Sequence, residues 1–116
     1  MSFLGERRSE LRKSDFIESC RLKLTSSKDV SQSWEVLPLD VSSRGLGFLV
    51  QSDLKVGEFY ILDIGGEGHR VEIAYCTLYQ TDPGPGEWSH RCGVFLREPT
   101  GDLKIACKNA RILLEP

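Results

Sequence analysis

The chain has 116 residues, of which 40% are hydrophobic and 28% are charged, and its formal net charge is −2. That length fits one globular domain, and a slightly negative charge argues against general binding to DNA or RNA. No run of residues approaches the roughly 20 apolar ones that span a bilayer, and charges from Glu6 onward interrupt any apolar signal segment. We therefore expect a cytoplasmic protein with no nucleic-acid partner and no membrane span.

Residues 1–14 carry positive charge and few apolar side chains. The basic residues among them are Arg7, Arg8, Arg12 and Lys13. Because there are too few apolar positions to dock a packed element, we expect a flexible arm. Arginine guanidinium groups pair well with phosphate and with the O6/N7 edge of guanine. The alternative interpretation is an arm that is simply solvated, as charge runs usually are.

The rest of the chain, residues 15–116, predicts one domain built mostly from strands. Apolar and polar residues alternate over residues 16–25, which predicts a strand. Its apolar face would carry Phe16, Cys20, Leu22 and Leu24. A second strand is expected over residues 34–42, where Pro38 lacks a backbone donor and favours an edge position or a bulge.

Further strands are predicted over residues 46–50, 59–64, 71–75 and 88–97. The run Gly65-Gly66-Glu67-Gly68 is typical of a hairpin turn, and residues 81–87 read as a loop. About six strands with short glycine-rich connections indicate a mainly all-β fold, a six-stranded antiparallel β-barrel.

The C-terminal residues, about 101–114, change to a helical period. Their apolar stripe consists of Leu103, Ala106, Cys107, Ala110 and Leu114. Thr100 is a plausible N-cap, and Ile105 would lie on the exposed face. We expect this helix to cover one opening of the barrel.

The stretch from Asp40 to Gly45 is the strongest candidate for a binding site. If the apolar residues Leu37, Leu39 and Val41 face the core, Asp40 and Ser42 share the outer face, since strand side chains alternate. A carboxylate there can accept hydrogen bonds from the ring and exocyclic N–H groups of guanine. Gly45 allows a sharp bend or the close approach of a ligand. The alternative is that Asp40 and Ser42 only cap the following turn.

Residues Arg8 to Arg12 read RxxxR, and Asp40 to Gly45 read DxSxxG. In this order and spacing, within a chain of this length, the two motifs resemble the PilZ domain, the bacterial receptor module for cyclic di-GMP. The resemblance covers most of the chain and implies the same architecture, a six-stranded barrel with a C-terminal helix. It also implies that Arg8 and Arg12 bind phosphate or guanine and that Asp40 and Ser42 read the guanine edge.

The resemblance extends to three further positions. An arginine directly before RxxxR goes with capture of two stacked ligand molecules, so Arg7 predicts a two-molecule site. Gly93, in a strand that resembles the family's later glycine-bearing strand, is expected under the same site. Arg44 adds a cation beside it, either for phosphate or merely solvated.

The implied function is a switch rather than an enzyme, since no catalytic arrangement of Ser, His, Asp or Cys stands at motif spacing. Ligand binding would order the arm and change the contact with an unidentified protein target, with motility and biofilm formation as the implied processes. We expect a monomer or weak homodimer without cofactor. A PilZ-like adaptor that binds only proteins is the alternative.

A metal site is not expected, because the cysteines are scattered and the two histidines form no recognisable pair with them. The sequence instead suggests that the cysteines are small buried hydrophobic residues. They are Cys20, Cys76, Cys92 and Cys107.

Overall fold

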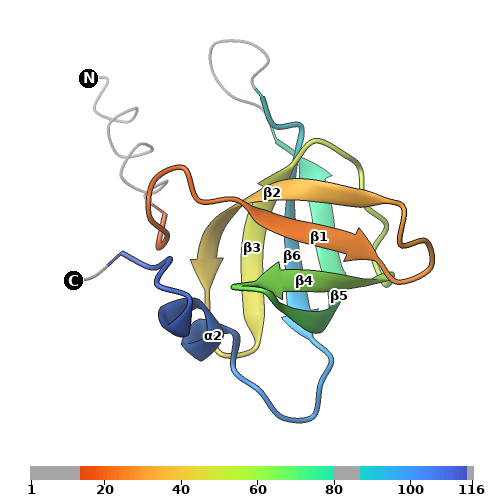
Figure 1. Cartoon of the computed structure of the whole chain (residues 1–116). Helices are drawn as coiled ribbons and strands as arrows, with labels where there is room; N and C mark the ends of the chain where they lie inside the picture. The colour runs from red at the N-terminus through yellow and green to blue at the C-terminus, as the bar shows by residue number, and fades with distance from the viewer. Residues whose placement is uncertain (1–13, 80–86, 115–116) are drawn as a thin grey trace, which may run out of the picture.

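A computed structural model of the chain describes residues 14–79 and 87–114. In these residues, six antiparallel strands form a closed barrel in the order β1–β2–β3–β6–β5–β4, followed by a short helix (Figure 1). The elements are β1 Leu22–Ser26, β2 Ser33–Val41, β3 Gly45–Val50, β4 Phe59–Ile64, β5 Glu67–Leu78, β6 His90–Leu96 and α2 Leu103–Asn109. The predicted barrel with a C-terminal helix is confirmed.

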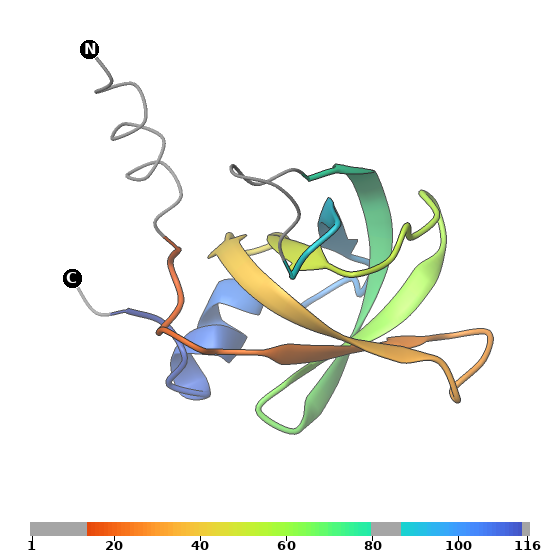
Figure 2. The same cartoon turned by 90° about the horizontal axis from the view of Figure 1, so that it is seen from above.

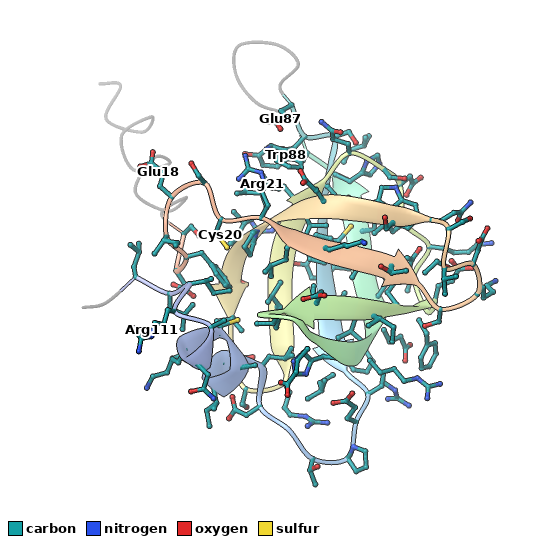
Figure 3. The ribbon with its side chains drawn as sticks, viewed as in Figure 1. Glu18, Cys20, Arg21, Glu87, Trp88 and Arg111 are labelled. Carbon is teal, nitrogen blue, oxygen red and sulfur yellow. The ribbon has the colours of Figure 1, made fainter. Side chains whose placement is uncertain are left out.

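The core lies inside the barrel, and all six strands contribute buried side chains to it. Figure 2 shows the barrel from above. Alternate residues along each strand point inward, as the period of two requires. Fully buried side chains include Leu24, Val36, Phe48, Leu62 and Ile73. At one end of the barrel, the Arg21 guanidinium lies 5.3 Å from the Trp88 ring centroid, which holds the segments before β1 and β6 together (Figure 3).

The first strand is shorter than the sequence predicts, because it begins at Leu22 rather than at Phe16. Ser19 has a φ of 69°, and the Cys20 N–H donates to the Ile17 carbonyl, so the chain turns before β1. Phe16 is still buried, but it pairs with Leu113 of the C-terminal tail. Pairing with a distant segment has therefore replaced the predicted extension of the strand.

The inward face of β2 also differs from the prediction. The buried residues in its middle are Val36 and Pro38, not Leu37 and Leu39. A bulge between Pro38 and Asp40 then shifts the register against β3. Because one extra residue reverses the alternation, Val41 packs on the core while Asp40 is exposed. The bulge that Pro38 suggested is present, and Asp40 faces outward because of it.

The glycine-rich run between β4 and β5 forms a hairpin turn, as predicted. Gly65 and Gly66 have φ angles of 61° and 90°, which suit a two-residue turn. The Gly66 N–H donates to Asp63 Oδ1 at 2.9 Å. The predicted loop at residues 81–87 lies outside the described residues except for Glu87.

The helix is shorter than predicted and has a different cap. It begins after Asp102, whose Oδ1 accepts a hydrogen bond from the Ile105 N–H at 2.9 Å, so Thr100 is not the N-cap. It ends at Asn109, and Arg111 has a φ of 62°, which turns the tail away to pair with the segment around Phe16. Within residues 14–79 and 87–114, no helix is long and apolar enough to cross a membrane.

The position of α2 at the barrel end is fixed by its buried face. Leu103 and Cys107 are fully buried in the barrel core, and the Leu103 N–H donates to the Ser43 carbonyl at 2.7 Å, just past β2. Figures 1 and 2 show α2 beside this end of β2. Ile105 lies on the opposite face and is 54% exposed, as expected.

Candidate functional site

The turn between β2 and β3 is closed by Ser42 and Gly45. The Ser42 N–H donates to the Gly45 carbonyl at 2.9 Å, and the Gly45 N–H donates to Ser42 Oγ at 3.1 Å. The Ser42 hydroxyl therefore has a structural role in the turn. It is nevertheless exposed on the same side of the barrel as Asp40.

Four residues face one another across four neighbouring strands. Asp40 of β2 pairs with Gly47 of β3, Gly47 pairs with Gly93 of β6, and Gly93 pairs with Tyr75 of β5. A Cβ atom on Gly47 would lie 2.7 Å from Asp40 Oδ1, and one on Gly93 would overlap the Tyr75 ring. The two glycines thus allow a carboxylate and an aromatic ring to lie over the backbone of the central strands.

Two bulges turn the end residues of this row of four, Asp40 and Tyr75, toward the outer face of the barrel. The bulge in β2 turns Asp40 outward, and a second register shift in β5 falls between Ile73 and Tyr75. Residues two apart on a regular strand share a face, yet Ile73 is fully buried and Tyr75 is 41% exposed. The extra residue, Ala74, therefore directs the Tyr75 ring to the outer face.

An open depression of about 410 Å³ lies over this row. The predicted site residues that line it are Asp40, Ser42, Gly45 and Gly93. Tyr75 and Gly47 line it as well. Its volume is within the range of about 300–1,000 Å³ that is usual for small-molecule sites. The structure thus brings four of the predicted residues together at one place on the outer face of the barrel.

The Asp40 carboxylate lies beside the guanidinium of Arg91. Arg91 Nη2 lies 3.4 Å from Asp40 Oδ2, and the two side chains are 40% and 59% exposed. Exposed pairs of this kind are worth only about 0–1 kcal/mol. The carboxylate can therefore exchange this contact for a ligand at little cost, and Arg91 would remain beside it as a cation.

A second depression, of about 520 Å³, adjoins the first and shares Val41 with it. Lys104 and Lys108 of α2 line it, one helical turn apart, together with Ser14 and Asp15. Ser14 Oγ donates to the Pro38 carbonyl at 3.1 Å, and the Asp15 N–H donates to the Leu39 carbonyl at 2.8 Å. The chain therefore runs along β2 directly beside Asp40.

The three arginines of the predicted arm, Arg7, Arg8 and Arg12, lie outside the described residues. Ser14, two residues after Arg12 in the sequence, is the first residue that the structure describes. It is hydrogen-bonded to β2 beside Asp40 and lines the second depression.

Among the predicted site residues that the structure describes, Arg44 differs from the others because it does not line the depression. Its guanidinium donates to the carbonyls of Leu96, Glu98 and Gly101 at 3.2, 2.6 and 3.2 Å. These bonds fasten the β2–β3 turn to the connection between β6 and α2. The structure therefore gives Arg44 a scaffolding role.

We expect Arg44→Ala to lower the free energy of unfolding by about 1–3 kcal/mol, because hydrogen bonds to charged groups each contribute about 1.5–3 kcal/mol and these are partly exposed. Urea denaturation would measure the change. Arg91→Ala is the matched control, and its loss should stay within about 1 kcal/mol. An Arg44 variant as stable as the control would contradict the scaffolding role.

Sequence reasoning missed three residues of this surface, Gly47, Tyr75 and Arg91. Gly47 carries a signal in the sequence, since it is a second glycine two residues after Gly45. Tyr75 carries none, because its pattern continues that of the buried residues Val71 and Ile73 until the bulge intervenes. Arg91 approaches Asp40 only through the pairing of β3 with both β2 and β6.

In the part of the chain that the structure describes, no group of three or more His, Cys, Asp or Glu side chains is placed to hold a metal ion. Comparison of the chain with protein-family models, curated proteins and solved structures gave no match.

Proposed function

We propose that this chain is a PilZ-type receptor that binds cyclic di-GMP on the outer face of β2, β3, β6 and β5. The observation that carries the proposal is the lining of one depression by Asp40, Ser42, Gly45 and Gly93. Spacing in the sequence selected the first three as ligand residues, and the family resemblance added the fourth. Their convergence with an exposed aromatic ring is what a nucleotide site needs.

The chemistry of the depression suits a guanine base. The Asp40 carboxylate can accept from the N1–H and the exocyclic amino group of guanine, both of which are donors. Gly47 and Gly93 leave room for the Asp40 carboxylate and the Tyr75 ring to lie over the central strands, where both groups line the depression. The exposed Tyr75 ring then offers a face on which a base can stack, an interaction worth about 1–3 kcal/mol per base.

The phosphates would be bound by the arginine arm. Arg8 and Arg12 precede Ser14, which is hydrogen-bonded to β2 beside Asp40. Lys104 and Lys108 add positive charge to the adjoining depression. Two neighbouring depressions that share Val41 offer room for the two stacked ligand molecules that Arg7 predicts.

Binding would hold the arm against the barrel and change the surface that a partner protein meets, an order–disorder mechanism of switching. The exposed side of α2, with Ile105, lies next to the second depression and belongs to the surface that would change. The partner is a protein target whose contact depends on the bound nucleotide.

Calorimetric titration of cyclic di-GMP tests the proposal. We expect saturable binding to the wild-type chain and at least tenfold weaker binding to Arg8→Ala, because the variant loses a charge-assisted bond worth about 1.5–3 kcal/mol. Lys23→Ala is the matched control: it removes the same charge from β1, away from the depression, and should bind like the wild type.

The same titration gives the stoichiometry, and two ligand molecules per chain are expected. Saturation at one molecule would contradict the role given to Arg7. Absence of heat, together with an unchanged melting temperature, would overturn the receptor proposal and favour an adaptor that contacts only proteins.

A further inference from the structure

Two cysteines face each other directly across the pairing of β5 and β6. Cys76 and Cys92 are register partners, and the Cys92 thiol donates to Cys76 Sγ with the sulfur atoms 2.9 Å apart. Both are free thiols. Nothing in the proposed nucleotide site uses them, although each adjoins a member of the Tyr75–Gly93 pair.

The backbone places this pair where a disulfide can form. The Tyr79 N–H donates to the Ser89 carbonyl at the end of the β5–β6 ladder. In an antiparallel ladder, hydrogen-bonded and non-hydrogen-bonded pairs alternate, so every second residue pair from Tyr79 and Ser89 onward is hydrogen-bonded. Cys76 and Cys92 are three positions away and fall in a non-hydrogen-bonded pair. In such pairs the Cα atoms are about 4.5 Å apart, inside the range of about 4.4–6.8 Å that disulfides span.

The two thiols differ in access. Cys92 is fully buried, whereas Cys76 is only half-buried and donates to Asp53 Oδ1 at 3.7 Å. Burial raises the pKa of Cys92 far above its ordinary value, and its hydrogen bond to Cys76 adds to the effect. Burial also raises the pKa of Cys20, and it raises that of Cys107 to about 11. Cys76 is therefore the thiol that an oxidant in solution can reach.

We propose that Cys76 and Cys92 form a reversible cross-strand disulfide by exchange with a low-molecular-weight disulfide such as oxidised glutathione. Cys76 is the attacking thiol, and Cys92 resolves the mixed disulfide. This property is independent of nucleotide binding.

The exchange balances in two steps. The Cys76 sulfur gives up its proton and attacks oxidised glutathione, which forms the Cys76–glutathione bond and releases one glutathione that takes up a proton. The Cys92 sulfur then gives up its proton and displaces the second glutathione, which forms the Cys76–Cys92 bond. The two cysteines together lose two electrons and two protons, and one oxidised glutathione becomes two reduced molecules.

The disulfide would lock β5 to β6 one position from the Tyr75–Gly93 pair. It would also close a chain loop between residues 76 and 92, which restricts the unfolded state. We expect the oxidised chain to melt roughly 10 °C higher than the reduced chain, as the entropy of a loop of this length predicts.

The test is to equilibrate the folded, full chain over a range of reduced to oxidised glutathione ratios, quench with acid, alkylate the remaining thiols in denaturant and digest with trypsin. Cleavage after Arg91 separates the two cysteines. We expect peptides 71–91 and 92–97 to become disulfide-linked together as the buffer turns oxidising. Peptides 14–21 and 105–108, which carry Cys20 and Cys107, serve as internal controls and should stay alkylated.

Two variants fix the order of the steps. In the Cys92→Ser variant, the reaction should stop at the mixed disulfide, with glutathione attached to peptide 71–91. Cys76→Ser, at the half-buried position, should leave peptide 92–97 free of glutathione, and this variant suffices if Cys92→Ser fails to fold. The proposal is overturned if both peptides remain alkylated at the most oxidising ratio, or if the wild-type chain accumulates only glutathione adducts.

Discussion

Asp40→Asn is expected to weaken the binding of cyclic di-GMP by about a hundredfold or more. The carboxylate at this position is the acceptor for two N–H groups of guanine in the proposed complex. Hydrogen bonds to a charged group contribute about 1.5–3 kcal/mol each, and an asparagine amide would turn a donor toward one of the guanine donors. Calorimetry on the folded variant measures the loss.

The control for this prediction is Glu35→Gln, which removes the same unit of charge from an exposed position of β2. Glu35 pairs with Lys23 of β1 and does not line the depression around Asp40. The affinity of the Glu35→Gln variant for cyclic di-GMP should equal that of the wild type within about threefold. The reason is that interactions between exposed charges more than a Debye length apart are largely screened. Equal affinities of Asp40→Asn and Glu35→Gln for cyclic di-GMP would mean that Asp40 does not bind the ligand.

The largest effect on stability is expected from Leu103→Ala. Leu103 is fully buried in the barrel core, and truncation of a buried leucine costs about 2–5 kcal/mol through lost transfer free energy and the cavity left behind. Small domains have only about 5–15 kcal/mol in total. Urea denaturation would therefore show a large shift of the midpoint.

Ile105→Ala on the same helix provides the comparison, because Ile105 is exposed. Its free energy of unfolding should change by no more than about 0.5 kcal/mol, as for most surface substitutions. A similar loss for both variants would mean that the exposed side of α2 is also packed, and a small loss for both would mean that α2 is dispensable for the barrel.

Local sequence patterns were sufficient to predict the barrel and part of its surface. Alternation predicts a strand because side chains take opposite faces, and glycines predict turns because of their backbone freedom, as at Gly65 and Gly66. Ser42 and Gly45 lie close in sequence and close one turn, so their spacing could be interpreted directly. These features depend on neighbours along the chain. Asp40 faces outward as predicted, but it does so because of the bulge after Pro38 and not because Leu37 and Leu39 face the core.

The features that sequence reasoning missed depend on distant segments. The segment around Phe16 fails to extend β1 because Leu113 pairs with it. Tyr75 faces outward because Ala74 is accommodated as a bulge against β6. The inward face of β2 changes at Pro38 for the same kind of reason. A one-residue shift in register reverses every later side chain. Pro38 gives a local signal for the shift in β2, whereas no local pattern indicates the shift in β5.

The segment that follows the arginine arm is also part of a continuous mechanical link. Asp15 bonds to Leu39 on one side, and its carbonyl accepts from the Leu114 N–H at 2.9 Å on the other. The Ile17 N–H likewise donates to the Ile112 carbonyl. In the proposed complex, an arm held over β2 would therefore be joined to the C-terminal tail through the backbone bonds of Asp15 and Ile17, and through that tail to α2. Closing the arm on the ligand would then bear on the C-terminal end of the described chain as well as on β2.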